Sequence, residues 1–345
     1  MPDYSPPEKI LHYIALQSRL TGQMLFDVER GIYLNASPDA SSEKHVFVTG
    51  LARAGTTALM RAIFNSDQFA SLTYKDMPFV LCPNLWGAIT KRFSRQPQIQ
   101  ERAHGDGILI DFNSPEALDE IFWRVFSGKN YIKEYGLVLH NPNEDVLHSF
   151  LDYIRLILHS RNKTRYLSKN NNNLLRLSAI KSILPNALFL IPIRHPLTHS
   201  WSLLSQHRRF SRGNVFTKRY MQWLGHHEFG ATHKPFIFHT YEKQYADADD
   251  LLYWIEVWHD CYKYLSQFLQ NAESGIYFVP YENLCTDKRV WQRLTELIGI
   301  DPDGENGFRQ NKKKHVETVA DRRELQRAEE LYAKITAQSL EILGF

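Results

Sequence analysis

Cysteine is scarce in this sequence of 345 residues, which has only Cys82, Cys261 and Cys285. The three lie far apart, and none belongs to a Cys-x-x-Cys pair. This pattern argues against a disulfide framework or a zinc site and favours a reducing compartment. We therefore expect a cytoplasmic protein.

Long apolar runs are also missing. Clean runs such as 187–193 are far shorter than the about 20 apolar residues that span a bilayer. Near the N-terminus, prolines together with Glu8 and Lys9 interrupt any signal-peptide core. The sequence therefore predicts no membrane span.

Neither sign of charge dominates the sequence. Lys and Arg number 41 against 38 Asp and Glu, which gives a formal net charge of +3. Such a balance argues against non-specific binding to nucleic acid. The 43% of hydrophobic residues and 23% of charged residues are ordinary for a globular protein and exclude a disordered chain. Nothing in the composition indicates an oligomeric state.

Alternating strand and helix patterns fill most of the chain. Short apolar runs predict strands, and apolar residues at helical spacing predict helices between and after them. This alternation predicts an α/β fold with a mostly parallel central sheet flanked by helices. The expected strands are 45–49, 165–168, 187–193 and 276–279, and the expected helices are 58–64, 145–159, 174–184, 249–269, 290–298 and 320–340.

The domain organisation follows from the turn-forming residues. A stretch rich in Ser, Asp and Pro at 35–42 reads as a linker after an N-terminal helical segment, so residues 1–42 are set apart. We expect residues 43–345 to form a single α/β domain. A helix-rich stretch around 210–270 is expected to form a cap over its sheet.

A glycine-bearing loop follows the first predicted strand. Its sequence, Gly50-Leu-Ala-Arg-Ala-Gly-Thr-Thr57, has the glycine spacing of a Walker A loop between a strand and a helix. Thr56 stands where a nucleoside triphosphatase has lysine, and Arg53 is the only cation of the loop. This predicts an anion loop for phosphate or sulfate, made by Arg53, Ala54, Gly55, Thr56 and Thr57. The alternative is an ordinary turn with a surface arginine.

A second basic strand end follows residues 187–193. Arg194 ends this strand, and Ser202 comes eight residues later, beyond Pro196. Ligands bind at the carboxyl ends of strands in open α/β sheets. A guanidinium and a hydroxyl there could bind a second phosphate. The alternative is an arginine that caps neighbouring carbonyls, with Ser202 on a solvated face.

Together these two motifs resemble the sulfotransferases, over roughly residues 45–300. The resemblance implies that Gly50–Thr57 holds the 5′-phosphosulfate of 3′-phosphoadenosine 5′-phosphosulfate (PAPS), and that Arg194 and Ser202 hold its 3′-phosphate. The segment Tyr281-Glu-Asn-Leu284 is similar to a Tyr-Glu-x-Leu segment of the family, which adds Tyr281 to the nucleotide site. The match is closer to the bacterial and tyrosylprotein branches than to the cytosolic phenol enzymes.

Several positions depart from the family pattern. Arg53 replaces the lysine of the cytosolic enzymes, and Ala58 replaces an aromatic residue that often follows the Thr pair. His195 stands in the usual Arg-Asp-Pro turn. The basic C-terminal loop of the family has only the run Lys312–Lys314 as a substitute.

Sulfuryl transfer requires cations near the leaving phosphate and a base for the acceptor hydroxyl, but no metal. Arg53 is one cation, and Lys169 matches a lysine of the tyrosylprotein branch that stabilises the leaving group. Residues 170–173, all Asn, either orient polar groups there or cap the next helix. For the base we rank Asp76 first and His104 second. Asp106 is third.

The sequence therefore predicts a PAPS-dependent sulfotransferase that acts on a hydroxyl of a carbohydrate, peptide or small molecule. Two alternatives remain open. One is a nucleotide or small-molecule kinase with a degenerate phosphate loop. The other is a catalytically inactive nucleotide-binding protein.

Overall fold

Five parallel strands form the central sheet. The computed structural model describes residues 5–91, 100–101, 109–110, 114–213, 215–238, 245–270, 275–301, 308–309 and 322–345. The strand order is β2–β6–β1–β7–β9, and every neighbouring pair is parallel, so the predicted α/β class is confirmed. The strands are β1 (Val46–Val48), β2 (Phe69–Ala70), β6 (Arg165–Lys169), β7 (Leu188–Ile193) and β9 (Ile276–Pro280).

Helices cover both faces of this sheet because the strand residues are apolar on both faces. Phe47 stacks on Phe189 on one face, whereas Val46 and Val48 pack into a second cluster on the other. The first face is covered by α6 (Glu144–Arg161), α7 (Leu177–Ile183), α10 (Leu251–Leu265) and α13 (Arg322–Ile342). The second is covered by α3 (Thr56–Phe64), α11 (Tyr281–Thr286) and α12 (Lys288–Ile298).

The predicted strands lie within one residue of the observed ones, but two predicted helices are divided. The helix expected at 249–269 is observed as α10 followed by the 3-10 turn η4 (Ser266–Gln270). Residues 174–184 were expected as a single helix, whereas a 3-10 turn η3 (Asn171–Leu175) precedes the shorter α7. Pro192 fits inside β7 because it lies beyond Leu190, the last residue of β7 that pairs with β1. Its missing amide therefore breaks no pairing to that strand.

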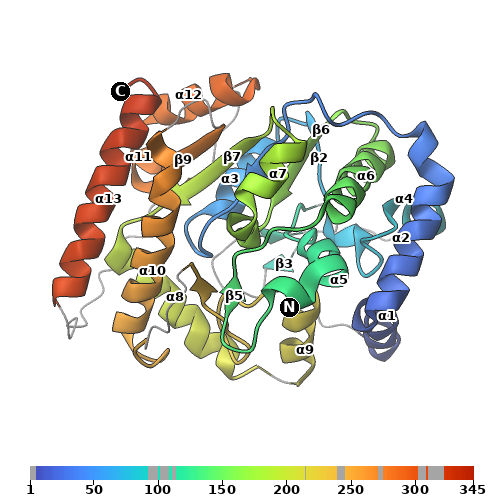
Figure 1. Cartoon of the computed structure of the whole chain (residues 1–345), viewed down its shortest axis with the longest axis horizontal. Helices are drawn as coiled ribbons and strands as arrows, with labels where there is room; N and C mark the ends of the chain where they lie inside the picture. Colours follow the sequence, from blue (N-terminus) through green and yellow to red (C-terminus); the bar gives the residue numbers. More distant parts are fainter. Residues whose placement is uncertain are drawn as a thin grey trace.

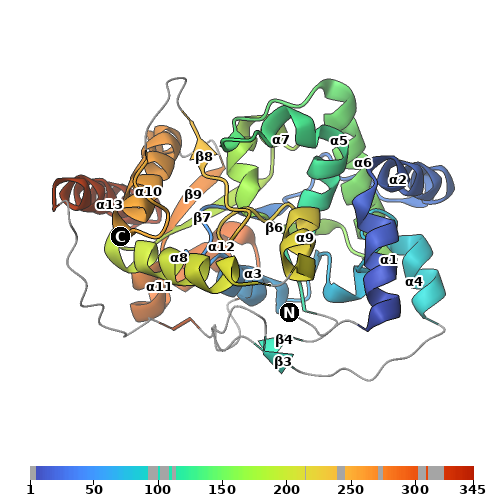
Figure 2. The same cartoon turned by 90° about the horizontal axis from the view of Figure 1, so that it is seen from below.

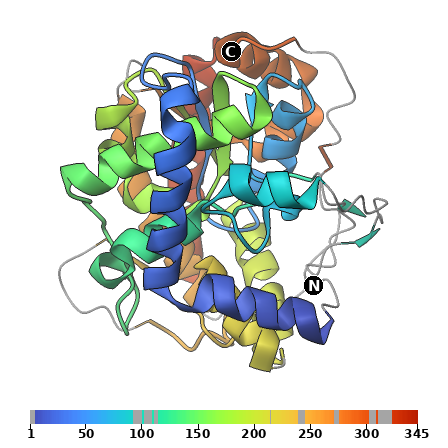
Figure 3. The same ribbon diagram turned by 90° about the vertical axis from the view of Figure 1, so that its right-hand side faces the viewer.

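The N-terminal helices α1 (Pro6–Gln17) and α2 (Arg19–Tyr33) lie on the outside of the molecule (Figure 3). The 3-10 turn η1 (Leu34–Ala36) follows them. The buried face of α2 is formed by Gly22, Phe26 and Glu29, whereas Leu20 and Met24 are 65% and 60% exposed. The apolar spacing of this segment therefore predicts the helix correctly but does not predict which of its faces is buried.

In Figure 2, α7 lies on one side of strands β6 and β7, and α3 lies on the other. Figure 1 shows α10 and α13 on one side of the molecule and α1 and α2 on the opposite side. The cap predicted at 210–270 stays a prediction, although that stretch contains helices α9 and α10. The remaining elements are η2 (Tyr74–Asp76), α4 (Pro83–Thr90), β3 (Gln100–Glu101), β4 (Leu109–Ile110), α5 (Glu120–Tyr131), β5 (Leu137–Val138), α8 (Pro196–Ser211), α9 (Val215–Leu224), β8 (Phe236–Ile237) and η4 (Ser266–Gln270).

Within the described part of the chain, every helix is too short or too polar to cross a bilayer.

Candidate active site

The loop between β1 and α3 has the backbone conformation of an anion-binding turn. Arg53 has φ 71° and Gly55 has φ 105°, and α3 begins directly afterwards at Thr56. A Cβ at Gly55 would lie 2.3 Å from Cε2 of Tyr281, so both the left-handed backbone and the close ring require glycine there. The first amides of a helix have no partner within the helix and carry partial positive charge. Such a helix start can therefore bind a phosphate or sulfate.

Two side chains hold the carbonyls of this loop. Nε2 of His199 donates to the carbonyl of Ala52 at 2.8 Å, and Nη1 of Arg194 donates to the carbonyl of Arg53 at 2.7 Å. His199 is fully buried, and burial together with the neighbouring charge of Arg194 lowers its pKa to about 3. The imidazole is therefore neutral and donates from one nitrogen. In the planar trans peptide between Ala52 and Arg53, the N–H points opposite to the carbonyl. Because the Ala52 carbonyl points to His199 on α8, the N–H of Arg53 points away from α8.

The structure brings together four residues predicted from distant parts of the sequence. Nε of Arg53 donates to the hydroxyl of Ser202 at 3.2 Å. Arg194 lies 5.7 Å from the ring centre of Tyr281, which itself packs on Gly55. Among the described residues, the buried Nε of Arg194 has no hydrogen-bond acceptor. An unpartnered guanidinium nitrogen beside a second arginine and a hydroxyl fits an anionic group.

Tyr281 is held here by the residue that follows it. Glu282 accepts the amide of His195 at 3.0 Å and the hydroxyl of Tyr332 at 3.0 Å. It thereby joins the start of α8 to α13. Tyr281 therefore packs against the loop between β1 and α3, and Glu282 fixes the start of α8, the helix that carries Ser202.

Lys169 ends β6 beside the start of the phosphate loop, because its pairing partner in β1 is Val48. Its side chain is largely buried, and Nζ lies 3.9 Å from Oε1 of Glu116. Glu116 also accepts the amide of Ala117 at 2.9 Å and the hydroxyl of Tyr74 at 2.7 Å. A lysine and a carboxylate therefore lie together at the edge of the sheet where the loop begins.

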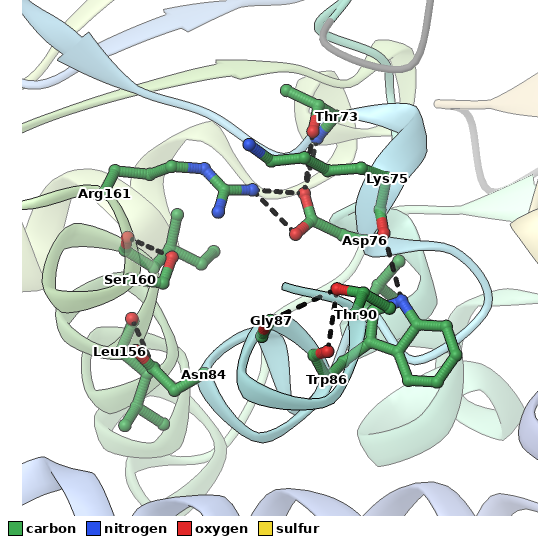
Figure 4. A network of polar contacts seen from close by, with 12 residues as sticks. Thr73, Lys75, Asp76, Asn84, Trp86, Gly87, Thr90, Leu156, Ser160 and Arg161 are labelled. Atoms are coloured by element: carbon green, nitrogen blue, oxygen red, sulfur yellow. Dashed lines mark hydrogen bonds and ion pairs between the residues drawn. The ribbon is translucent and has the colours of Figure 1, made fainter. Parts of the chain in front are cut away.

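Asp76 has different surroundings (Figure 4). It is only 3% exposed, and its carboxylate accepts the amide of Thr73 at 2.7 Å and the Thr73 hydroxyl at 3.1 Å. Nη2 of Arg161, at the end of α6, lies 2.6 and 2.5 Å from the two carboxylate oxygens. These contacts are those of a carboxylate that anchors the turn η2. To accept a proton from a substrate, Asp76 would have to give up part of this ion pair.

The remaining predicted residues, His104, Asp106 and Lys312–Lys314, lie outside the described part of the chain. Their roles stay predictions.

A small pocket of about 10 Å³, enough for about one water molecule, lies beside the loop between β1 and α3. Apolar residues make most of its walls, and Glu228 contributes a carboxylate that accepts the side-chain amide of Asn171 at 2.8 Å. Trp254 lines this pocket and is itself fully buried, as are Trp123 and Trp258. The lining residues are Leu51, Ala52, Leu203, Glu228, His233, Lys234, Pro235, Phe236, Trp254 and Val257.

No group of three or more His, Cys, Asp or Glu side chains in the described ranges could hold a metal ion.

Comparison with known proteins identifies the family of this chain. A profile of the sulfotransferase family matches residues 45–303. The chain belongs to the sulfotransferase family. The solved structure of sulfotransferase STF1 from Mycobacterium tuberculosis H37Rv has 16% sequence identity and a TM-score of 0.51, covering 95% of this chain and 84% of that one. Sulfotransferase STF9 from Mycobacterium avium has 12% identity and a TM-score of 0.49, covering 99% of this chain and 87% of that one. No curated protein matches the sequence.

Sequence reasoning missed two residues that lie at this candidate site, Glu116 and His199. Glu116 meets Lys169 through a loop that pairs Thr73 with Pro115, and no local pattern marks it. His199 lies in the first turn of α8, three residues after Pro196, and contacts the loop through the carbonyl of Ala52. His199 and Ser202 are three residues apart, so helical spacing would have placed these two residues near one face of α8.

Proposed function

We propose that this sulfotransferase moves the sulfuryl group of PAPS to the hydroxyl of an acceptor. The observation that carries the proposal is the grouping of Arg53, Arg194 and Ser202 at the start of α3, with the buried Nε of Arg194 lacking an acceptor among the described residues. PAPS has two phosphate positions, and this site offers two guanidinium groups and a helix N-terminus for them.

The residues of the site divide into binding and transfer roles. Arg194, Ser202 and Tyr281 would hold the 3′-phosphate side, and the loop from Arg53 to Thr57 would hold the 5′-phosphosulfate. In the reaction, the acceptor oxygen forms a bond to sulfur while the bond from sulfur to the bridging oxygen of the 5′-phosphate breaks. Arg53 and Lys169 are proposed to stabilise the negative charge that develops on that leaving oxygen.

A base must remove the proton of the acceptor hydroxyl. We propose Glu116 for this role, because it lies beside Lys169 and is nearly buried. Asp76 remains a candidate from the sequence, but its ion pair with Arg161 favours an anchoring role. His104 and Asp106, ranked second and third from the sequence, also remain candidates.

The nucleotide assignment is tested by calorimetry on Arg194→Ala. We expect this variant to bind 3′-phosphoadenosine 5′-phosphate about 10- to 100-fold more weakly, since a charged hydrogen bond is worth about 1.5–3 kcal/mol. Binding of adenosine 5′-phosphate should change much less. Equal weakening of both nucleotides would show that Arg194 does not contact the 3′-phosphate.

An acceptor screen with labelled PAPS tests the activity itself. Transfer of label to a carbohydrate, peptide or small-molecule hydroxyl supports the proposal. Nucleotide binding without magnesium and without transfer to any acceptor would favour an inactive binding protein. Magnesium-dependent binding of ATP would favour a kinase instead.

The three separate cysteines support our further proposal of a cytoplasmic location.

A further inference from the structure

Two residues that flank Lys169 are tied to the start of α5. The hydroxyl of Ser168 donates to Oδ2 of Asp119 at 2.5 Å, and the side-chain amide of Asn170 donates to Oε2 of Glu120 at 2.8 Å. Side chains of a strand alternate between its two faces, so residues 168 and 170 point the same way and Lys169 points the other way. The two carboxylates therefore hold the side chains of the residues on either side of this lysine.

Glu120 is itself held firmly. Arg176 donates to both of its oxygens, with Nη1 at 2.9 Å and Nη2 at 3.2 Å, and the hydroxyl of Tyr131 donates to Oε1. The guanidinium of Arg176 lies 4.7 Å from the ring centres of both Trp123 and Tyr131. Glu120 and Arg176 are each 1% exposed. Rotation of the Glu120 carboxylate would therefore leave charged atoms unpaired inside the protein.

A pair this deeply buried needs a reason other than stability. Removing two charges from water costs several kcal/mol per ion, and apolar side chains of similar size often serve stability as well or better. The pair does, however, fix the position of the Asn170 side chain. The backbone N–H of Asn170 also extends the sheet, because it donates to the carbonyl of Val48 at 3.0 Å. Lys169 lies one residue before it.

We propose that Asp119, Glu120 and Arg176 form a clamp that positions Lys169 toward the leaving oxygen. This inference rests on the proposed function. The clamp fixes the backbone segment from which the Lys169 side chain extends, and a fixed starting point for this side chain before reaction raises the rate rather than the nucleotide affinity. The three clamp residues are positioning residues, because they act through Lys169 and do not touch the substrate.

The test is a double-mutant cycle between Asn170→Ala and Lys169→Ala. We expect Asn170→Ala alone to lower kcat about 5- to 20-fold, with the affinity for 3′-phosphoadenosine 5′-phosphate changed less than twofold. In the Lys169→Ala background it should lower kcat no further, because residues that act as a unit are not additive. Ser168→Ala is the milder second variant if Asn170→Ala does not fold.

The matched control is Asn84→Ala. The Asn84 amide donates to Oε1 of Glu29 at 2.7 Å, so the variant removes the same kind of bond at the contact between α2 and α4. It should leave kcat unchanged. Equal loss of kcat in the control, or a full additional loss in the Lys169→Ala background, would overturn the clamp.

A second readout does not depend on turnover. Protein labelled with ¹³C at the lysine ε-carbons gives an NMR signal for Lys169 that Lys169→Arg identifies. Asn170→Ala should shift or broaden this signal, and Asn84→Ala should not. If the wild-type protein transfers no sulfuryl group, the proposed function fails, and this signal still decides whether the clamp holds Lys169. An unmoved signal would overturn the clamp alone.

Discussion

Two buried pairs of a carboxylate with an arginine differ in what they connect. Asp76 and Arg161 are bonded to each other, and Asp76 is also bonded to Thr73, which caps the same short turn. Glu120 and Arg176 are also bonded to each other, but Glu120 continues to Asn170, beside Lys169. The chemistry of the two pairs is the same, and their partners differ.

This difference teaches that a buried carboxylate is not assigned a role by its residue type or by its distance from a motif. Asp76 follows the phosphate-loop helix, as a base would, yet its bonds close within η2 and α6. Glu120 carries no motif, yet its bonds lead to the edge of the sheet where the candidate site lies. The route of hydrogen bonds to the site separates an anchoring pair from a positioning pair.

The largest expected effect comes from breaking each pair at its arginine. Arg176→Met would leave Glu120 charged and buried, so we expect the free energy of unfolding to fall by about 3–5 kcal/mol. Arg161 is 18% exposed, and water can replace part of its contact with Asp76. Arg161→Met should therefore cost less than half as much. Urea unfolding at equilibrium measures both losses, and equal losses would remove the distinction between the pairs.

The next effect separates the two candidate bases. Glu116→Gln should lower kcat by about 10²-fold or more, because the amide cannot take the acceptor proton. Asp76→Asn should leave kcat within about threefold while lowering stability, since it weakens only the anchor of η2. Steady-state kinetics at saturating PAPS and acceptor measure both variants.

Other outcomes would reassign the base. Collapse of kcat in Asp76→Asn with little change in Glu116→Gln would return the role to Asp76. Little change in either variant would direct the test to His104→Gln.

The sequence predicts those parts of the site that depend on neighbours in the chain. The loop between β1 and α3 is marked by its local glycine spacing, and Arg194 is predicted as a candidate ligand because it follows a strand whose residues are apolar on both faces. Glu116 and Arg161 escaped prediction because their partners, Lys169 and Asp76, lie more than 50 residues away in the chain.

The same reasoning applies to the fold. Strands β1, β6, β7 and β9 were predicted because an apolar run of strand length is readable. The strands β2 and β5 have only two residues each, which is too short for any periodicity. The sequence also did not predict that an apolar face of α2 is exposed. Helical spacing shows that apolar residues share one face of the helix, but it does not show whether that face packs against the rest of the protein.

The smallest expected effect concerns Asp119, a clamp carboxylate that has no arginine bonded to it. Burial raises the pKa of Asp119 from 3.8 to about 6. The hydrogen bond from Ser168 lowers this pKa, but its effect is smaller than that of burial. Between these two pH values the folded protein binds more protons than the unfolded chain at this position. Stability therefore falls as the pH rises from about 4 to about 6, and the loss is complete above that range.

Asp119→Asn removes this titration while keeping an oxygen for Ser168. Relative to the wild type, its free energy of unfolding should rise by about 1–3 kcal/mol between pH 4 and pH 7.5, since one pKa unit corresponds to about 1.4 kcal/mol. Urea unfolding of both proteins at a series of pH values gives this difference. The slope with pH is the decisive quantity, because the new amide can add a constant cost of its own. Thr90→Ala changes no titratable group and should run parallel to the wild type. If Asp119→Asn also runs parallel, Asp119 is ionised at pH 5 in the folded protein, and the clamp then holds two charged carboxylates against a single arginine.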